Sequence, residues 1–157
     1  MTKITPCLWF DGNAEDAIEF YCSVFPGAEV LDVMHYGEAG PGRAGKVMSM
    51  TFRLAGQEFI ALNGGPHFTF SPAISFFIAC DTQAEVDALW AKLLVGGAPQ
   101  QCGWLTDRFG LSWQIVPKGL HEMLQDPNPA KANAVMSAML GMVKLDIDAL
   151  RRAYEQA

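Results

Sequence analysis

The sequence predicts an α+β fold made of two copies of a strand, helix and strands unit, followed by a helical C-terminal extension. The first observation is an internal repeat, since three positions recur at a constant spacing of seventy: Asp11 and Asp81, Gly27 and Gly97, Ala28 and Ala98. The second is the alternation of apolar and polar side chains over Val47–Leu54, which is typical of a strand with one buried face. The third is an apolar stripe at helical period in each copy.

The first copy spans a predicted strand, a helix and three further strands. We expect a strand within Ile4–Asp11, a helix from Asn13 to Gly27, and strands over Glu29–Tyr36, Val47–Leu54 and Glu58–Leu62. Asn13 is the predicted helix cap because Asn accepts a hydrogen bond from the first free backbone N–H groups of a helix. The apolar stripe of this helix consists of Ala14, Ile18, Tyr21 and Phe25.

The second copy repeats the order in a shorter form. We expect a strand over Ile74–Asp81, a helix from Thr82 to Gly96, a strand over Ala98–Trp104, a turn at 107–110 and a strand over Leu111–Val116. Thr82 followed by Glu85 has the spacing of a capping box. The apolar stripe of this helix consists of Val86, Leu89, Trp90 and Leu93.

The domain organisation follows from these elements. We predict a first unit over 1–66, a second over 67–119 and a helical extension over 120–157, all within one compact domain. The extension carries an apolar stripe of Val135, Met136, Met139 and Leu140, which suits a cover for the sheet or a dimer contact. We expect a homodimer.

Composition excludes several classes of function. The chain has 11 Lys and Arg against 17 Asp and Glu, a net charge of −6, so we expect no nucleic-acid or membrane partner. The N-terminal residues show no signal-peptide pattern, and we expect a cytoplasmic protein. The four cysteines form no C-x-x-C pair, and reduced, buried thiols are expected rather than a zinc site.

Four separated stretches resemble a known family. Trp9–Glu15, Asn63–Phe68, Cys80–Asp87 and Cys102–Pro117 resemble the PhnB-like branch of the vicinal-oxygen-chelate superfamily, which includes glyoxalases, bleomycin-resistance proteins and dioxygenases. The branch is often labelled 3-demethylubiquinone-9 3-methyltransferase. The resemblance implies two βαβββ modules that form a curved mixed β-sheet cup, and many relatives hold a divalent metal in that cup.

The resemblance also locates the positions that carry metal ligands in those relatives. They fall on Thr5 and Ser75 on the first strand of each module, and on Gln114 and Ile60 on the last, with Asn63 the nearest polar residue to Ile60. Because neutral hydroxyl and amide groups hold zinc, nickel or iron poorly, we predict a site without metal and no cofactor.

The predicted ligand is a small organic molecule. Gln114 interrupts an otherwise apolar strand, so its amide needs a backbone partner or a ligand. Trp residues beside the cup suit stacking on a flat ligand, with core packing as the alternative for each. The candidate substrate-binding residues are Thr5, Trp9, Asn63, Ser75, Trp104, Trp113 and Gln114.

Any reaction is undefined by the sequence. His67 is a candidate catalytic residue because an imidazole titrates near neutral pH, with local packing as the alternative. Gly40–Gly45 matches a dinucleotide motif but precedes a strand, so we interpret it as a loop, and no S-adenosylmethionine motif supports the methyltransferase label. Three hypotheses remain: a metal-free, PhnB-like protein acting on a bound molecule, a non-catalytic sequestering protein of the drug-resistance type, and a metal-dependent isomerase, lyase or dioxygenase.

Overall fold

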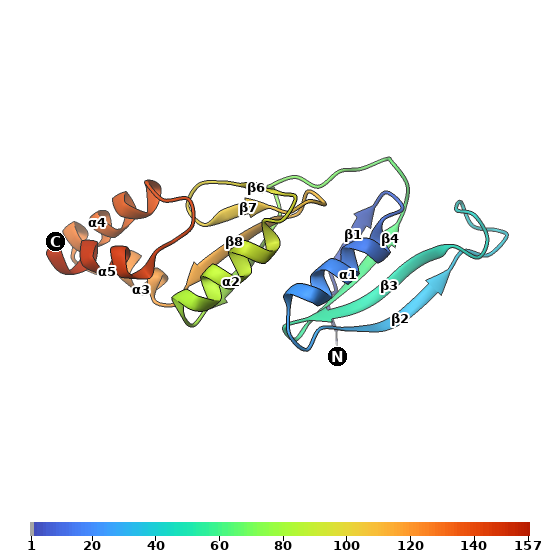
Figure 1. The fold of residues 1–157 in the computed structure, drawn as a ribbon, viewed down its shortest axis with the longest axis horizontal. Coiled ribbons are helices and arrows are strands. Elements are labelled where there is room, and N and C mark those ends of the chain that lie inside the picture. Colours follow the sequence, from blue (N-terminus) through green and yellow to red (C-terminus); the bar gives the residue numbers. More distant parts are fainter. Residues whose placement is uncertain (1) are drawn as a thin grey trace. The chain divides into compact units, whose positions relative to one another are not determined.

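The computed structural model describes residues 2–157, and the chain divides into two compact units, with the boundary in the sequence between Phe70 and Ser71 (Figure 1). Each unit contains one four-stranded sheet and one helix packed on it. The prediction of two βαβββ modules with mixed sheets and a helical extension is confirmed, and each sheet is open rather than closed into a barrel.

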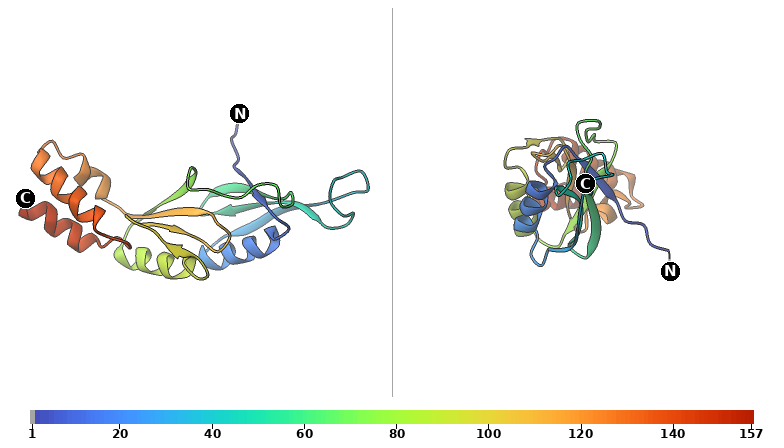
Figure 2. Two further views of the ribbon diagram at one scale, coloured as in Figure 1. Left: turned by 90° about the horizontal axis from the view of Figure 1, so that it is seen from above. Right: turned by 90° about the vertical axis from the view of Figure 1, so that its right-hand side faces the viewer.

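The first unit contains β1 (Cys7–Phe10), α1 (Ala14–Val24), β2 (Glu29–His35), β3 (Val47–Leu54) and β4 (Gln57–Asn63). The strand order is β1-β4-β3-β2, with β1 parallel to β4 and the other pairs antiparallel. Gly40–Gly45 lies in the loop between β2 and β3, as the sequence predicted. The helix α1 lies along one face of this sheet in both views (Figure 2).

Packing in the first unit follows the predicted periodicities. The four residues of the α1 stripe, Ala14, Ile18, Tyr21 and Phe25, are all buried. Phe52 and Leu54 on β3 point the same way as Phe59 and Ala61 on β4, and these side chains form the core beneath the helix. The opposite face of the sheet, which we call the open face, carries Trp9, Thr51 and Ile60, all half-buried.

The second unit begins with β5 (Ser75–Cys80), α2 (Gln83–Leu93), β6 (Ala98–Pro99), β7 (Trp104–Thr106) and β8 (Ser112–Pro117). The strand order is β5-β8-β7-β6, which repeats the connectivity of the first sheet, with β5 parallel to β8.

The predicted strand over Ala98–Trp104 is interrupted, because Ala98–Pro99 belong to β6 and Trp104 to β7, while residues 100–103 between them are not in a strand. Cys102 and Gly103 adopt positive φ angles of 58° and 82°, which extended backbone does not allow.

The C-terminal extension forms three helices, α3 (Leu120–Leu124), α4 (Pro129–Leu140) and α5 (Ile147–Gln156). Its core consists of Leu120, Val135, Leu145 and Leu150. Of the predicted α4 stripe, Val135 is buried and Met139 packs against the core, whereas Met136 and Leu140 are 41% and 58% exposed.

The two main helices are capped in different ways. Thr82 accepts a hydrogen bond from the N–H of Glu85 at 3.2 Å, so the predicted cap of α2 is confirmed. Asn13 makes no side-chain cap bond, and the prediction for α1 is wrong. The first N–H of α1, that of Ala14, instead donates to Oδ1 of Asn63 at 2.9 Å, from the end of β4.

All four cysteines are free thiols, as expected, but only Cys80 is buried; Cys7 is exposed, and Cys22 and Cys102 are half-buried. Burial raises the pKa of the Cys80 thiol to about 11, and the nearby carboxylates of Glu85 and Asp81 add to the shift. Within residues 2–157, none of the helices has the length and apolar character needed to span a membrane.

Candidate functional site

The candidate site lies on the face of the second sheet that points away from α2, which we also call the open face. The strand register places Phe77 on β5 and Trp104 on β7 on either side of Gln114 on β8, so the amide is flanked by two aromatic residues. Nε2 of Gln114 donates a hydrogen bond to Oγ of Ser75 at 2.9 Å. The two polar residues that were predicted for the site in this unit are therefore hydrogen-bonded to each other. The amide oxygen of Gln114 is uncharged and would attract a cation only weakly.

A pocket of about 230 Å³ opens beside Gln114. The sheet side contributes Phe77, Cys102, Trp104, Gln114 and Val116, and the extension contributes Leu120, His121, Leu124, Met139 and Leu145. Phe77 is 59% exposed, which is unusual for a phenylalanine on a strand. The pocket is smaller than a typical drug-sized site and is lined chiefly by apolar side chains, so it suits a small ligand.

At the two positions that align with Ser75 and Gln114, the first unit has Thr5 and Ile60, which do not form an equivalent polar pair. Cys7 pairs with Ile60 in the first sheet, and Phe77, seventy positions after Cys7, pairs with Gln114 in the second. The strand register therefore supports the alignment of Gln114 with Ile60. Thr5 is half-buried just before β1. An aliphatic side chain at Ile60 and a hydroxyl at Thr5 give this face no strong metal donor at the aligned positions.

Two charged groups on this face of the first unit, Glu58 and Arg53, are already paired. Glu58 accepts hydrogen bonds from Lys3 and, at 3.1 Å, from Arg53, and these bonds lower the pKa of its carboxyl. Among residues 2–157 no group of three or more His, Cys, Asp or Glu side chains is placed to hold a metal ion. The donors present therefore do not fit the divalent metal that the fold implies.

Trp113 occupies a different place from the one expected. It lies on the α2 face of β8, is 3% exposed, and packs edge-on against Phe76 with ring centroids 5.3 Å apart. Its indole Nε1 donates to Oδ2 of the buried Asp107 at 2.8 Å. The expectation that Trp113 faces the ligand side is corrected, because strand side chains alternate and Gln114 occupies the open face.

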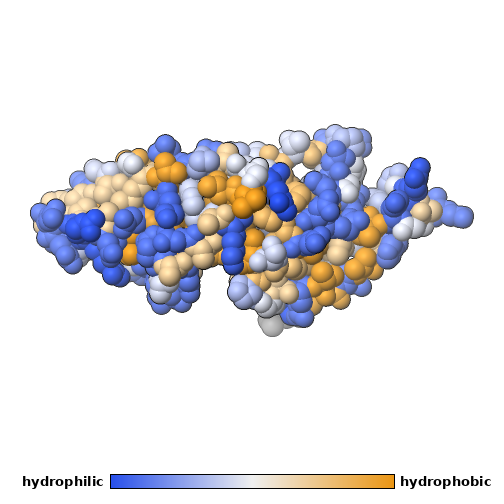
Figure 3. Space-filling view, viewed as in Figure 1, coloured by the Kyte–Doolittle hydropathy of each residue, from blue (hydrophilic) through white to orange (hydrophobic). Residues whose placement is uncertain are grey.

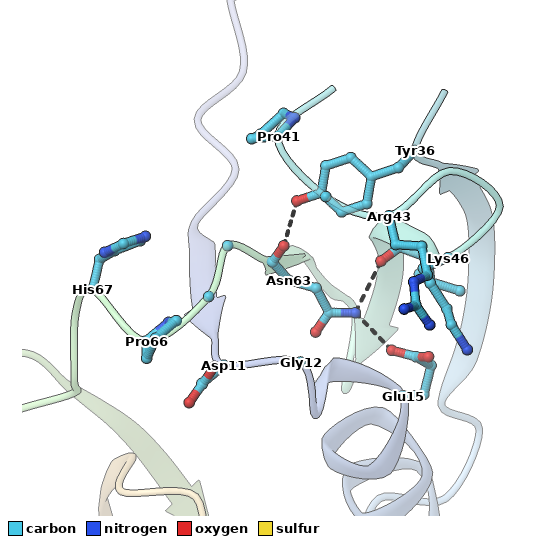
Figure 4. A pocket seen from close by; sticks show the side chains of 14 residues that line it. Asp11, Gly12, Glu15, Tyr36, Pro41, Arg43, Lys46, Asn63, Pro66 and His67 are labelled. Atoms are coloured by element: carbon cyan, nitrogen blue, oxygen red, sulfur yellow. Dashed lines mark hydrogen bonds between the residues drawn. The ribbon is translucent and has the colours of Figure 1, made fainter. Parts of the chain in front are cut away.

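Asn63 and His67 line a second, larger groove of about 570 Å³ in the first unit (Figure 4), whereas Trp9 is outside its lining and contacts the residues that follow β4. Indole Nε1 of Trp9 donates to the carbonyl of Gly65 at 2.9 Å, and its ring meets Phe68 edge-on with centroids 4.9 Å apart. His67 is exposed and its ring lies 6.3 Å from that of Trp9.

Asn63 is the structural centre of this groove (Figure 4). Besides capping α1, its Nδ2 donates to Oε1 of Glu15 at 2.7 Å and to the carbonyl of Val47 at 3.1 Å, and its backbone carbonyl accepts the hydroxyl of Tyr36. Asn63 therefore ties α1, β3 and the β2–β3 loop together. Its side chain is engaged at both ends, which makes a structural role better supported than a ligand contact.

The groove mixes charges of both signs. Asp11 and Glu15 line it together with Arg43 and Lys46 from the β2–β3 loop. All four side chains are exposed, so water screens the field that any one of them exerts on a bound ion.

Three features of the site were absent from the sequence prediction. His121 was not among the predicted site residues, but it lines the Gln114 pocket. Phe77 was not singled out, although its place in the period-two pattern of β5 puts it beside Gln114. Asp107 was assigned only to a turn, whereas its carboxylate also accepts the N–H groups of Phe109 and Leu111.

Comparisons with known proteins agree with this architecture. The PhnB protein from Bacillus cereus is 39% identical, with a TM-score of 0.67, over 74% of this chain and 99% of its own. The protein PA1353 from Pseudomonas aeruginosa is 24% identical, with a TM-score of 0.62, over 74% of this chain and 98% of its own, which supports the fold.

The fosfomycin resistance protein FosX from Listeria monocytogenes, solved with Mn(II) and sulfate, shares the fold at 15% identity and a TM-score of 0.51, over 79% of this chain and 95% of its own. A search of curated proteins found no match. A family model described as 3-demethylubiquinone-9 3-methyltransferase matches residues 2–116. The match to this model over residues 2–116 and the 39% identity to PhnB show that the chain belongs to the 3-demethylubiquinone-9 3-methyltransferase family, and its two βαβββ modules have the fold that FosX shares.

Proposed function

We propose that this protein binds a small, uncharged organic molecule on the open face of its second sheet, in a pocket that needs no metal. The observation that carries the proposal is the row of Phe77, Gln114 and Trp104 beside a cavity of about 230 Å³. The two aromatic rings would make apolar contact with the ligand, and the amide of Gln114 would fix the ligand's orientation through a hydrogen bond.

Gln114 is the residue that orients the ligand in this proposal. Its Nε2 is held by Ser75, so its Oε1 is left to accept a hydrogen bond from a ligand hydroxyl or N–H. A ligand with such a donor would gain about 1 kcal/mol from this bond.

Protein NMR tests the proposal directly. In a titration of ¹⁵N-labelled protein with 2-naphthol, the side-chain signals of Gln114 and Trp104 should shift together, and Gln114→Leu should weaken binding about fivefold or more. Gln57→Leu, at an exposed position of the first unit, is the matched control. If no flat, uncharged probe moves the Gln114 and Trp104 signals, the pocket is only a packing defect and the proposal fails.

The same probe separates binding from catalysis. His67 lines the groove of the first unit, and the proposal needs no imidazole for affinity. A sequestering protein of the drug-resistance type would release its ligand unchanged, and chromatography of the probe after incubation would show this. If the wild type converts the probe to a product and His67→Ala does not, the protein is an enzyme that uses His67 rather than a sequestering protein.

A homodimer also belongs to the proposal, with two exposed apolar surfaces as candidates. All seven residues of β2 are exposed at the edge of the sheet, and Figure 3 shows apolar side chains along this strand. The other surface is formed by Met136 and Leu140 on α4. Analytical ultracentrifugation of Val33→Lys and Met136→Lys would locate the dimer contact, because the variant that becomes monomeric carries its change in that contact. A monomeric wild type would refute the dimer.

A further inference from the structure

The Gln114 pocket has two walls of different origin. One is the open face of the second sheet, and the other is built by the C-terminal extension through Leu120, Leu124, Met139 and Leu145. The family match ends at residue 116, before the extension starts at Leu120. The Bacillus cereus PhnB protein is covered almost completely by the alignment, which leaves about a quarter of this chain without a counterpart.

The extension is held against the sheet by backbone hydrogen bonds. The N–H groups of Cys102 and Gly103 donate to the carbonyls of Met142 and Val143 at 2.9 and 2.7 Å. A Cβ at Gly103 would lie 2.8 Å from Cδ1 of Leu145, so the loop and the extension are in direct contact.

Side chains of α2 hold the extension from the other side. Gln83 bonds to the extension twice, donating to the carbonyl of Leu145 at 2.9 Å and accepting the N–H of Ile147 at 2.8 Å. Lys144 forms an ion pair with Asp87 at 2.8 Å. These contacts fix the backbone on both sides of the fully buried Leu145, and the wall is therefore formed before any ligand arrives.

The chemistry of the wall restricts what can bind. None of the ten lining residues is Asp, Glu, Lys or Arg, and the lining side chains that can form hydrogen bonds are those of Trp104, Gln114, His121 and Cys102. A phosphate or a dicarboxylate would lose part of its hydration in a pocket that has no Lys or Arg to pair with its charge. The walls therefore favour a flat, uncharged compound of one or two rings with a single hydroxyl or N–H.

We infer that the C-terminal extension sets the size and charge selectivity of the Gln114 pocket, which thereby takes small phenol-like or indole-like compounds. The inference rests on the proposed function. Met139 is the residue to test, because it lines the pocket and packs against the core of the extension, while Met136 on the same helix is 41% exposed and lies outside the lining.

The experiment uses the full chain, with Gln114 and Trp104 side-chain NMR signals as the readout. The probes are 2-naphthol, 2-naphthyl phosphate and the three-ring 9-phenanthrol. Wild type should bind 2-naphthol at least tenfold more tightly than the other two. Met139→Trp should weaken the binding of 2-naphthol at least tenfold. Met139→Ala should reduce the difference in affinity between 2-naphthol and 9-phenanthrol. Met136→Trp should bind all three probes with the affinities of the wild type.

The outcomes separate the two proposals. If 2-naphthol shifts Gln114 in every variant with equal affinity, the extension does not select the ligand, and the proposed function stands alone. If wild type binds 2-naphthyl phosphate as tightly as 2-naphthol, the charge selectivity is refuted. If no probe shifts the signals of wild type, the proposed function fails and this inference fails with it. Met139→Ala acts in the opposite direction to Met139→Trp, so a folding defect in the larger variant leaves the size test intact.

Discussion

The replacement of Asn63 by alanine probes how the first unit is held together. The side chain accepts the N–H of Ala14 at the start of α1 and donates to the carbonyl of Val47 and to Glu15. Alanine removes all three hydrogen bonds while leaving the β4 backbone able to pair with its neighbours.

The expected loss can be assembled from these bonds. Loss of a helix cap costs about 1 kcal/mol. Loss of the bond to the part-buried carbonyl of Val47 costs about 1 kcal/mol more, and the exposed bond to Glu15 contributes little because water replaces it. We expect Asn63→Ala to lower the free energy of unfolding by about 2 kcal/mol.

Urea denaturation followed by circular dichroism measures this loss, and hydrogen exchange of the peptide 14–24 locates it in α1. Asn13→Ala is the matched control, because Asn13 occupies the sequence position of the cap without making the bond, and its change should stay within about 0.5 kcal/mol. Equal losses in the two variants, or an Asn63→Ala loss below about 0.5 kcal/mol, would refute the long-range cap.

Four further predictions concern Asp107, the thiols and the metal content. Asp107→Ala leaves the N–H groups of Phe109, Leu111 and Trp113 without their acceptor, so we expect a loss of about 3 kcal/mol or more in urea denaturation, and a loss below about 1 kcal/mol would contradict the assigned network. Cys80, with a pKa raised to about 11 from its ordinary 9.0, should stay unmodified by iodoacetamide at pH 8 while the exposed Cys7 is labelled, as mass spectrometry of the digested protein would show. Because the folded thiol holds its proton more tightly, its contribution to stability is complete below pH 9 and is lost as the pH rises toward 11, and Cys80→Ala should lack this component. Elemental analysis of purified protein should find no stoichiometric zinc, nickel, manganese or iron, and a full equivalent of any of them would overturn the metal-free site.

Much of the fold was predictable from the sequence because the repeat and the periodicities act locally. The strand over Val47–Leu54 and the cap at Thr82 follow from side-chain alternation and from a spacing of three residues. The cap of α1 escaped prediction because its acceptor, Asn63, lies forty-nine residues beyond Ala14. Only the pairing of β1 with β4 brings the two together.

The site was predictable in part for a related reason. Gln114 was found because its polar side chain interrupts an apolar strand and Ser75 because the family resemblance pointed to its position, and the two side chains form a hydrogen bond. Trp104 and Trp113 looked equivalent in the sequence, yet Trp104 lines the pocket and Trp113 lies in the core. The pairing of β7 with β8 determines that Trp104 lies on the same face as Gln114 and that Trp113 lies on the opposite face. This strand register cannot be read from the composition of the strands.

The hydrogen bonds between the 102–103 loop and residues 142–143 have a consequence for biosynthesis. The first unit contains all its strands and its helix by Asn63, so it has the elements needed to fold while the rest of the chain is still on the ribosome. The second unit lacks part of its core until Leu145 and Leu150 have left the exit tunnel, well after its last strand, β8, and until then its pocket has only the wall that the sheet forms.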